Sequence, residues 1–593
     1  MKRIYIILAA ALSVCACSKF LDTRTDVFDT MDRLQTRSST LTSFAYAYYT
    51  PMGNGFNVID GNLFASASDE AEQAAPTSEA QTFNRGLLSA DLNPLSYKYT
   101  NCYEGIRAAR FFLEYAKGGE DFLALNRDTS TVYNPDGTVY STEQPKAYKR
   151  DCINLGWQRA EAYIAEAYYY GELLKMYGGV PLLDPETGIA RQASYDEVVE
   201  HIVDLIDSHL DELNLDWRVA LDPTAENAVA DVTNWNFRDE TGRWDRTSAL
   251  AVKARVLLYA ASPRNNPMDD VEKWEKAAEA ANDVIQMRKA VFAKGFGFGE
   301  GARTYPDWHM PVNRDYGNYF IKNNATSDTE SIFLIRQAAG SAPEAANYPI
   351  GTRGGNSGVC PTQNLVDAYE YVGPEVPDPY ANRDPRLAAT IVCNGSTWNG
   401  NVIDESKGGA YDSRVAGASP TGYYLRKFLA PNLNLVEGGS TDHIWPLYRY
   451  AEVLLNYAEA MNEAYGPDAD PKGYGMTARQ ALTEVRQSAS TSLPAVTATS
   501  KTDFRNAVKQ ERRVELAFED HRYWDLLRWK DAMTVLNKAI KGTSVRKNEL
   551  GGFQYSYPTV AYRTFYERNY YFPFTRKEIS NGGGAITQNP EYN

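Results

Sequence analysis

Acidic and basic side chains are concentrated in the stretch 511–530, ERRVELAFEDHRYWDLLRWK. Glu511 and Glu515 are four residues apart, so a helix would place both carboxyl groups on one face, where they could act as general acid and base. Carboxylates at this spacing far more often form a solvated or ion-paired face than a reactive pair. We therefore interpret Glu511 and Glu515 as structural and predict no catalytic residue.

Patterns for other chemistry are incomplete. The histidines at 201, 209, 309, 443 and 521 form no HExxH pair, and no GxSxG segment occurs. The glycine-rich segment 295–301 follows no strand of a βα unit, and Asp468 and Asp470 lack the other ligands of a calcium loop. The sequence thus predicts no cofactor and no metal site, and leaves open only whether a calcium ion is bound.

An aromatic loop, TYPDWHMPVNRDYGNYF (304–320), is the strongest candidate for ligand binding. Pro306 and Pro311 disfavour a helix, and Trp308 between them is either an exposed platform or a ring that fills the core. Aromatic planes suit the C–H face of a sugar ring, and polar side chains suit its hydroxyl groups. The predicted ligand-binding residues are Trp308, Tyr305, Tyr316, Tyr319, Asn313, Arg314 and Asp315, with Phe83, Tyr97 and Tyr99 from an earlier loop.

The N-terminus resembles a lipoprotein signal peptide. Lys2 and Arg3 precede a mostly apolar segment, 4–14, that is too short to span a membrane, and VCAC (14–17) resembles a lipobox. Cleavage before Cys17 would leave residues 1–16 as signal peptide and residues 17–32 as a lipid-anchored tether. The alternative is an ordinary secretory signal.

Composition excludes some partners. The net charge of −15 over 593 residues, without a long basic run, argues against nucleic acid. The 41 tyrosines and 10 tryptophans suit recognition of ligands with apolar and hydroxyl faces. Four cysteines would remain in the mature chain, either as free thiols or in disulfides: Cys102, Cys152, Cys360 and Cys393.

The same 511–530 stretch predicts two helices that meet at Glu519 and Asp520. Phe504, Val508 and Val514 lie on one stripe before this corner, and Asp520 is positioned to cap the second helix. Apolar spacing predicts further helices around 41–48, 103–113, 156–177, 198–210, 250–261, 274–285, 447–465 and 481–485.

These helices predict a mostly α fold of about four pairs that resemble tetratricopeptide repeats. We expect a single compact body with helical parts at 33–290 and 445–593. The part between them, 291–444, is rich in Gly, Asn, Pro and Tyr, and contains only short strand-like pieces at 331–336 and 389–393. We expect this irregular, loop-rich region to bind the ligand.

The stretch 511–530 also resembles the C-terminal signature of the SusD/RagB family of nutrient-binding outer-membrane lipoproteins. Other blocks that resemble this family, in the family's order, are NRDPRLAATI (382–391), PLYRYAEVLLNYAEAMNEA (446–464), ALTEVRQSAS (481–490) and YYFPFTRKEISNGGGAITQNPEYN (570–593). The resemblance covers nearly the whole mature chain, but its blocks are mainly scaffold.

The resemblance implies a lipid-anchored subunit on the extracellular face of the outer membrane. It would act as a lid on a SusC-like TonB-dependent transporter, and would capture oligosaccharides, or peptides in some members, for import without catalysis. Family members often build aromatic platforms from the two loop regions named above. A glycan-active enzyme is the less favoured alternative, and a purely structural scaffold does not explain the tyrosine-rich insertion.

Overall fold

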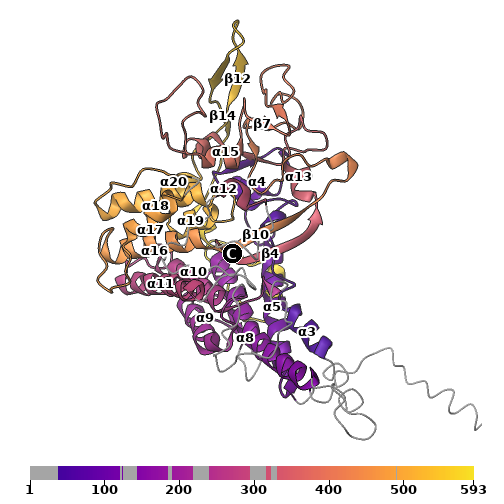
Figure 1. The fold of residues 1–593 in the computed structure, drawn as a ribbon, viewed down its shortest axis with the longest axis vertical. Helices are drawn as coiled ribbons and strands as arrows, with labels where there is room; N and C mark the ends of the chain where they lie inside the picture. The colour runs from indigo at the N-terminus through magenta and orange to yellow at the C-terminus, as the bar shows by residue number, and fades with distance from the viewer. Residues whose placement is uncertain are drawn as a thin grey trace, which may run out of the picture.

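The computed structural model describes residues 38–120, 123, 143–183, 190–217, 240–293, 315–321, 330–488 and 491–592. Its N-terminal part consists of packed helices at the bottom of Figure 1. Helix α3 (Ser38–Ala47) and α5 (Ser96–Tyr115) pack on the long α8 (Glu143–Tyr177), and α9 (Tyr195–His209) packs on the other side of α8. As predicted, α8 ends before Gly178, which has a positive φ of 77°.

The remaining long helices extend this stack. Helix α10 (Arg246–Ala261) packs on α11 (Val271–Ala293), which packs on α16 (Tyr450–Tyr465); α17 (Ala478–Arg486) and α18 (Lys501–Glu515) then pack on α16. Figure 1 shows them side by side, next to α19 (Arg522–Arg528). The predicted mostly α, repeat-like fold is confirmed.

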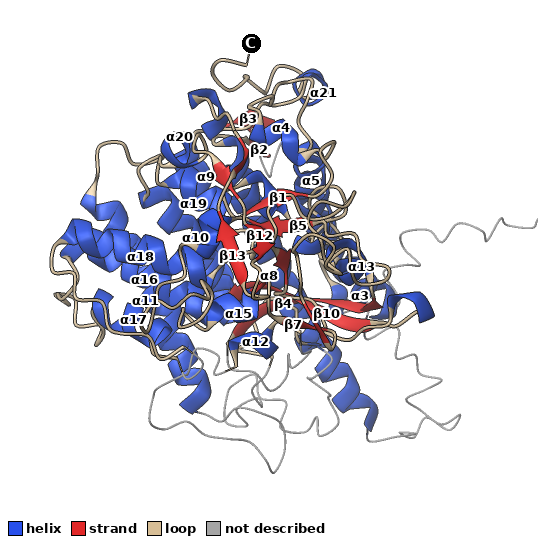
Figure 2. Ribbon diagram, turned by 90° about the horizontal axis from the view of Figure 1, so that it is seen from above, coloured by secondary structure: helices blue, strands red, loops and turns tan. Residues whose placement is uncertain are grey.

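The loop-rich region contains more strand than the sequence indicated. Strand β4 (Ser331–Gly340) pairs antiparallel with β10 (Thr441–Arg449), and this ribbon crosses the middle of the molecule (Figures 1 and 2). Residues 446–449, expected to begin a helix, are strand instead. The expected strand at 389–393 is half helix, since α15 (Arg386–Thr390) precedes β6 (Ile391–Val392).

Short elements surround this ribbon. The two-stranded sheets pair β1 (Ala71–Gln73) with β5 (Val359–Pro361), β6 with β9 (Tyr424–Leu425), β7 (Thr397–Trp398) with β8 (Asn401–Val402), and β12 (Ser544–Lys547) with β13 (Phe553–Ser556). The β12–β13 hairpin projects from the top of Figure 1. Buried apolar residues form one large core among the helices and a second beneath the loop-rich region.

The predicted corner between the last two long helices is confirmed, but its cap is different. Phe518 and Asp520 both have positive φ, 66° and 61°, and reverse the chain between α18 and α19. His521 is the N-cap residue of α19 and makes no side-chain cap. The carboxylate of Asp520 instead accepts a hydrogen bond from Trp524 Nε1 at 3.2 Å, so its predicted capping role is wrong.

The four cysteines of the mature chain are free thiols, which resolves the two alternatives. Cys102, Cys360 and Cys393 are buried, and burial raises the pKa of each thiol. None of the described helices is both long and apolar enough to cross a membrane.

Candidate functional site

The predicted aromatic platform is only partly within the described residues. Trp308, Tyr305, Asn313 and Arg314 lie outside them. Phe83 is 5% exposed, and its ring lies 5.0 Å from the Phe64 ring and 5.7 Å from the Phe572 ring. Because its faces are covered by other rings, the prediction of an exposed platform fails for Phe83.

The described end of the 304–320 loop is also packed inward. Tyr316 and Tyr319, in the short helix α12 (Tyr316–Tyr319), are buried. The Tyr316 hydroxyl donates to the Glu515 carbonyl at 3.0 Å, and the Tyr319 hydroxyl lies 2.8 Å from Ser331 Oγ. Asp315 is exposed and caps this helix. The two rings are therefore core rings and cannot stack on a ligand.

Tyr97 is the predicted ring that the structure leaves accessible. It lies on α5 and is 39% exposed, while its hydroxyl donates to the Val58 carbonyl at 2.8 Å. Partial burial, with the carboxylates of Asp520 and Glu79 nearby, raises the pKa of Tyr97 to about 12, so its hydroxyl stays protonated. Tyr99 is partly buried and packs 4.7 Å from the Tyr103 ring.

Tyr97 borders a cavity of about 250 Å³ at the seam between the helices and the end of strand β10, which we call the seam cavity; none of its lining residues lies in 291–444, the region expected to bind the ligand. This volume is just below the range of about 300–1,000 Å³ that is usual for small-molecule sites. The lining residues come from positions 51–58, 97–102, 168–175, 255–259, 445–447 and 519–521. The seam cavity therefore gathers groups that are far apart in the sequence.

Amide and aromatic side chains line this cavity and could form hydrogen bonds and stacking contacts with a ligand. Asn54, Asn57 and Asn101 offer donors and acceptors. Trp445 forms part of the wall, and a Cβ atom at Gly55 would lie only 2.0 Å from its ring, so a residue with a side chain at position 55 would displace this tryptophan. The combination of rings and hydrogen-bonding groups suits a polyhydroxylated ligand.

Two cations of the seam cavity, Arg255 and Lys175, are paired with carboxylates. Arg255 donates to Glu452 at 2.6 and 2.7 Å, and Lys175 lies 2.8 Å from Glu172. Burial alone would raise the pKa of Glu172, but Lys175 is among the cations that hold it below its usual value. These pairs hold this part of the wall in place.

Sequence reasoning missed most of this wall. Asn101 follows Tyr97 by four residues, so helical spacing alone would place the two on one face. His521 was visible as the histidine inside the 511–530 stretch. Lys175, Arg255 and Trp445 carry no comparable signal, because only the packing of α8, α10 and β10 brings them together.

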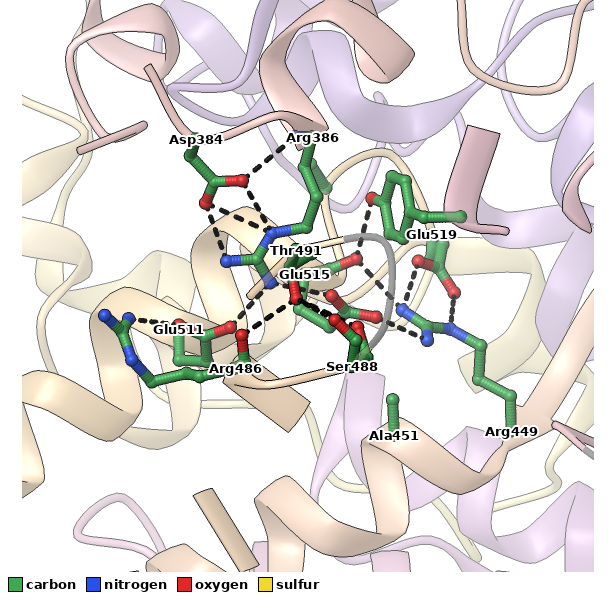
Figure 3. A network of polar contacts seen from close by, with 12 residues as sticks. Asp384, Arg386, Arg449, Ala451, Arg486, Ser488, Thr491, Glu511, Glu515 and Glu519 are labelled. Atoms are coloured by element: carbon green, nitrogen blue, oxygen red, sulfur yellow. Dashed lines mark hydrogen bonds and ion pairs between the residues drawn. The ribbon is translucent and has the colours of Figure 1, made fainter. Parts of the chain in front are cut away.

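Glu511 and Glu515 belong to a buried network of ion pairs (Figure 3). Arg386 Nη1 lies 2.5 Å from Glu511 and 2.7 Å from Glu515, and Arg449 Nη1 lies 2.7 Å from Glu515. Burial alone would raise the pKa of Glu515, but the guanidinium groups of Arg449 and Arg386 hold it below its usual value. The ion-paired interpretation is confirmed, although this face is buried and not solvated.

The network also touches the seam cavity. Arg449 binds Glu519 at 2.6 Å, and Glu519 is one of the cavity-lining residues. Within the described ranges, no group of three or more His, Cys, Asp or Glu residues could hold a metal ion. The arrangement can bind and orient a ligand, but it presents no matched acid, base and nucleophile.

Together the helical stack, the loop-rich region and the polar seam cavity define a SusD-like architecture. Residues 318–592 match the sequence profile of the SusD family. A SusD-like protein, P2, from Formosa agariphila is 25% identical over 385 residues, which are 63% of this chain and 65% of that protein. The matched region thus spans just under two thirds of the relative's length.

Solved structures agree over a longer stretch. A SusD-like protein from Bacteroides fragilis has a TM-score of 0.69 and 20% identity, and the match covers 96% of this chain and 99% of that one. A SusD-like carbohydrate-binding protein from the same species has a TM-score of 0.66 and 21% identity over 93% of this chain and 99% of that one. Residues 318–592 thus match the SusD family profile, and the fold of the chain is SusD-like.

Proposed function

We propose that this chain is a cell-surface lipoprotein that binds oligosaccharides and passes them to a SusC-like TonB-dependent outer-membrane transporter. It would bind its ligand without converting it, since the described site contains no catalytic constellation. The observation that carries this proposal is a polar seam cavity, edged by the exposed ring of Tyr97, in a chain of SusD-like fold whose residues 318–592 match the SusD family profile.

Three features support the proposal. Tyr97 offers an aromatic face, three asparagines offer amide groups, and the cavity is open at the seam where a ligand could enter. A solved relative of similar fold is itself a carbohydrate-binding protein. The lipobox at residues 14–17 supports attachment to the outer membrane through Cys17.

Calorimetry with a panel of oligosaccharides tests the binding step. We expect Tyr97→Ala to weaken binding by about 1–3 kcal/mol, the loss expected for an aromatic anchor. Tyr97→Phe keeps the ring and removes only the hydroxyl that bonds to Val58, so it should bind nearly as wild type. Tyr46→Ala is the matched control, because Tyr46 is 42% exposed on α3 and does not line the cavity.

The outcome separates the alternatives. Equal affinity of the Tyr97→Ala and Tyr46→Ala proteins would refute the cavity as the site. Binding of peptides, and of no oligosaccharide in the panel, would replace the proposed ligand class. Release of shortened sugars by the pure protein, in excess of its own molar amount, would show catalysis and contradict the non-enzymatic assignment.

A further inference from the structure

His521 occupies the inner wall of the seam cavity. It follows Glu519 and Asp520, and all three residues of this corner line the cavity. The positive φ of Asp520, 61°, turns the chain so that His521 precedes the first turn of α19. His521 is only 8% exposed, so its imidazole is surrounded by protein groups and kept away from bulk solvent.

The imidazole of His521 has no hydrogen-bond partner in the part of the chain that the structure describes. The main causes of its shifted pKa are burial and neighbouring charges, and no hydrogen bond is among them. The two ring nitrogens make no hydrogen bond, and neither is completely enclosed by protein atoms. They therefore border open space. The seam cavity is the open space that this residue lines.

An imidazole that makes no hydrogen bond to protein and lines a cavity keeps its donor and its acceptor available to a ligand in that cavity. Arg449 in Figure 3 donates to Glu519, Glu330 and Glu515, whereas the His521 ring makes no such bond. A ligand in the cavity would supply the missing bonds. His521 is therefore built as a contact residue and not as a structural one.

The charges around His521 fix its chemical form. Burial lowers the pKa of His521 well below its usual value, and the cations Arg255, Arg512 and Arg449 lower it further, while Asp525 opposes them. The imidazole is consequently neutral near pH 7. A neutral imidazole has one N–H donor and one acceptor nitrogen, which can serve the two roles of a sugar hydroxyl.

The cavity offers little to an anionic ligand. The lining carries three cations, Lys98, Lys175 and Arg255, and three carboxylates, Glu172, Glu519 and Asp520, so its charges balance. Two of the cations are also paired directly, Arg255 with Glu452 and Lys175 with Glu172. A uronic acid or sulfated sugar would have to compete with these pairs, whereas an uncharged hydroxyl group need not.

We propose that His521 is the specificity-determining contact of the seam cavity, where its neutral imidazole exchanges hydrogen bonds with hydroxyl groups of an uncharged sugar ring. This inference rests on the proposed function and adds to it the class of glycan and the residue that selects it. Tyr97, which is more exposed, provides the aromatic face on which a sugar ring stacks. His521, which is more buried, forms hydrogen bonds with its hydroxyl groups.

The test compares His521→Phe, which keeps a ring and removes both nitrogens, with His521→Gln, which restores a donor and an acceptor. The probes are oligosaccharides of laminarin, xylan and mannan as neutral sugars, and of alginate and polygalacturonate as acidic ones. We expect wild type to bind a neutral probe, the Phe variant to lose about tenfold or more in affinity, and the Gln variant to recover most of that loss. His209→Gln, outside the cavity, should bind as wild type.

An NMR readout keeps the test valid if a variant is unstable. The imidazole signals of His521 are identified as those missing from the His521→Phe spectrum. In the wild-type protein these signals should not titrate between about pH 6 and 8. They should shift when the bound neutral probe is added. Signals that ignore the probe would overturn the contact even if the Phe variant failed to fold.

The outcomes are separable. If neutral sugars bind equally to wild type and the Phe variant, the role of His521 is wrong but glycan binding stands. If only acidic probes bind, the inferred class of glycan is wrong. If neither sugar class binds and no shift is seen, the proposed function fails together with this inference.

Discussion

Glu70 illustrates how position in the fold changes the chemistry of a single residue. Its side chain is 2% exposed next to β1, and its carboxylate receives one long hydrogen bond, 3.3 Å from Phe518 N. Burial and the neighbouring charge of Asp69 raise the pKa of Glu70 to about 8, although Arg522 opposes them. At pH 7 the folded protein therefore holds this group mainly protonated.

Glu70 should make the protein less stable as the pH rises. Between the unfolded pKa near 4.5 and the folded pKa of about 8, the folded state binds the proton and the unfolded state does not, so the free energy of unfolding falls across this window. Glu70→Gln should reduce this pH-dependent decrease in the free energy of unfolding by an amount on the order of a few kcal/mol.

Chemical denaturation at a series of pH values measures the effect. Glu549→Gln, exposed near the tip of the β12–β13 hairpin, is the matched control and should keep the wild-type pH profile. Parallel profiles for the Glu70→Gln and wild-type proteins would show that Glu70 is ionised in both states.

Trp308 remains the residue whose role the sequence predicts most sharply. If it is a platform in the 304–320 loop, Trp308→Ala should cost about 1–3 kcal/mol of oligosaccharide binding with little change in melting temperature. Calorimetry and thermal unfolding of the same variant decide the question. A large fall in melting temperature would identify a core ring, and unchanged affinity would exclude a contact.

Residue type predicts which side chains could bind, but not which are exposed. Phe83 and Tyr97 lie in neighbouring segments, yet Phe83 packs on rings from α19 and from residue 572, hundreds of positions away. Only Tyr97 lies at the seam cavity. Burial depends on such distant partners, which is why the sequence could nominate aromatic residues but could not sort core rings from accessible ones.

At the level of elements, local signals were more reliable. The capping box of Ser194 and Glu197 starts α9 as its spacing predicts, and Gly178 ends α8. The β4–β10 ribbon was missed in its full length because its strands are about a hundred residues apart and their pairing has no local signature. The corner between α18 and α19 was found, because the apolar stripe stops there.

Arg386 binds three acidic side chains, Asp384 from its own segment and Glu511 and Glu515 from α18, so its loss should be severe. It binds Asp384 at 2.7 Å as well as Glu511 and Glu515, and all four side chains are almost fully buried. Arg386→Met should lower the free energy of unfolding by about 3–5 kcal/mol, because the remaining carboxylates would be buried without adequate compensation.

Urea denaturation measures this loss. Arg576→Met breaks an ion pair with Asp91 in which both side chains are largely exposed, so it should leave the midpoint unchanged. Similar midpoints for the Arg386→Met and Arg576→Met proteins would show that the buried network contributes little to stability.

At the scale of the whole molecule, the fold alone does not determine where the protein acts. The family blocks in 382–391, 446–464 and 511–530 are mainly scaffold, and the structure places them in α15 and the start of β6, in β10 and α16, and in the α18–α19 corner. They predicted the architecture well, since packing residues recur wherever the fold does. The proposed attachment to a membrane would instead depend on the N-terminal segment, which lies outside the described residues.

Cys17 should hold the whole molecule on the outer membrane. Two or more acyl chains on its thiol and amino group, each methylene contributing about 0.8 kcal/mol, would make dissociation negligible. Cys17→Ala should therefore release a folded protein that still binds its oligosaccharide. Cys15→Ala is a close control, since residue 15 would be removed with the signal peptide. Detergent-phase partitioning of cell fractions compares the two: retention of the Cys17→Ala protein with the membrane, or release of the Cys15→Ala protein, would contradict lipid attachment at Cys17.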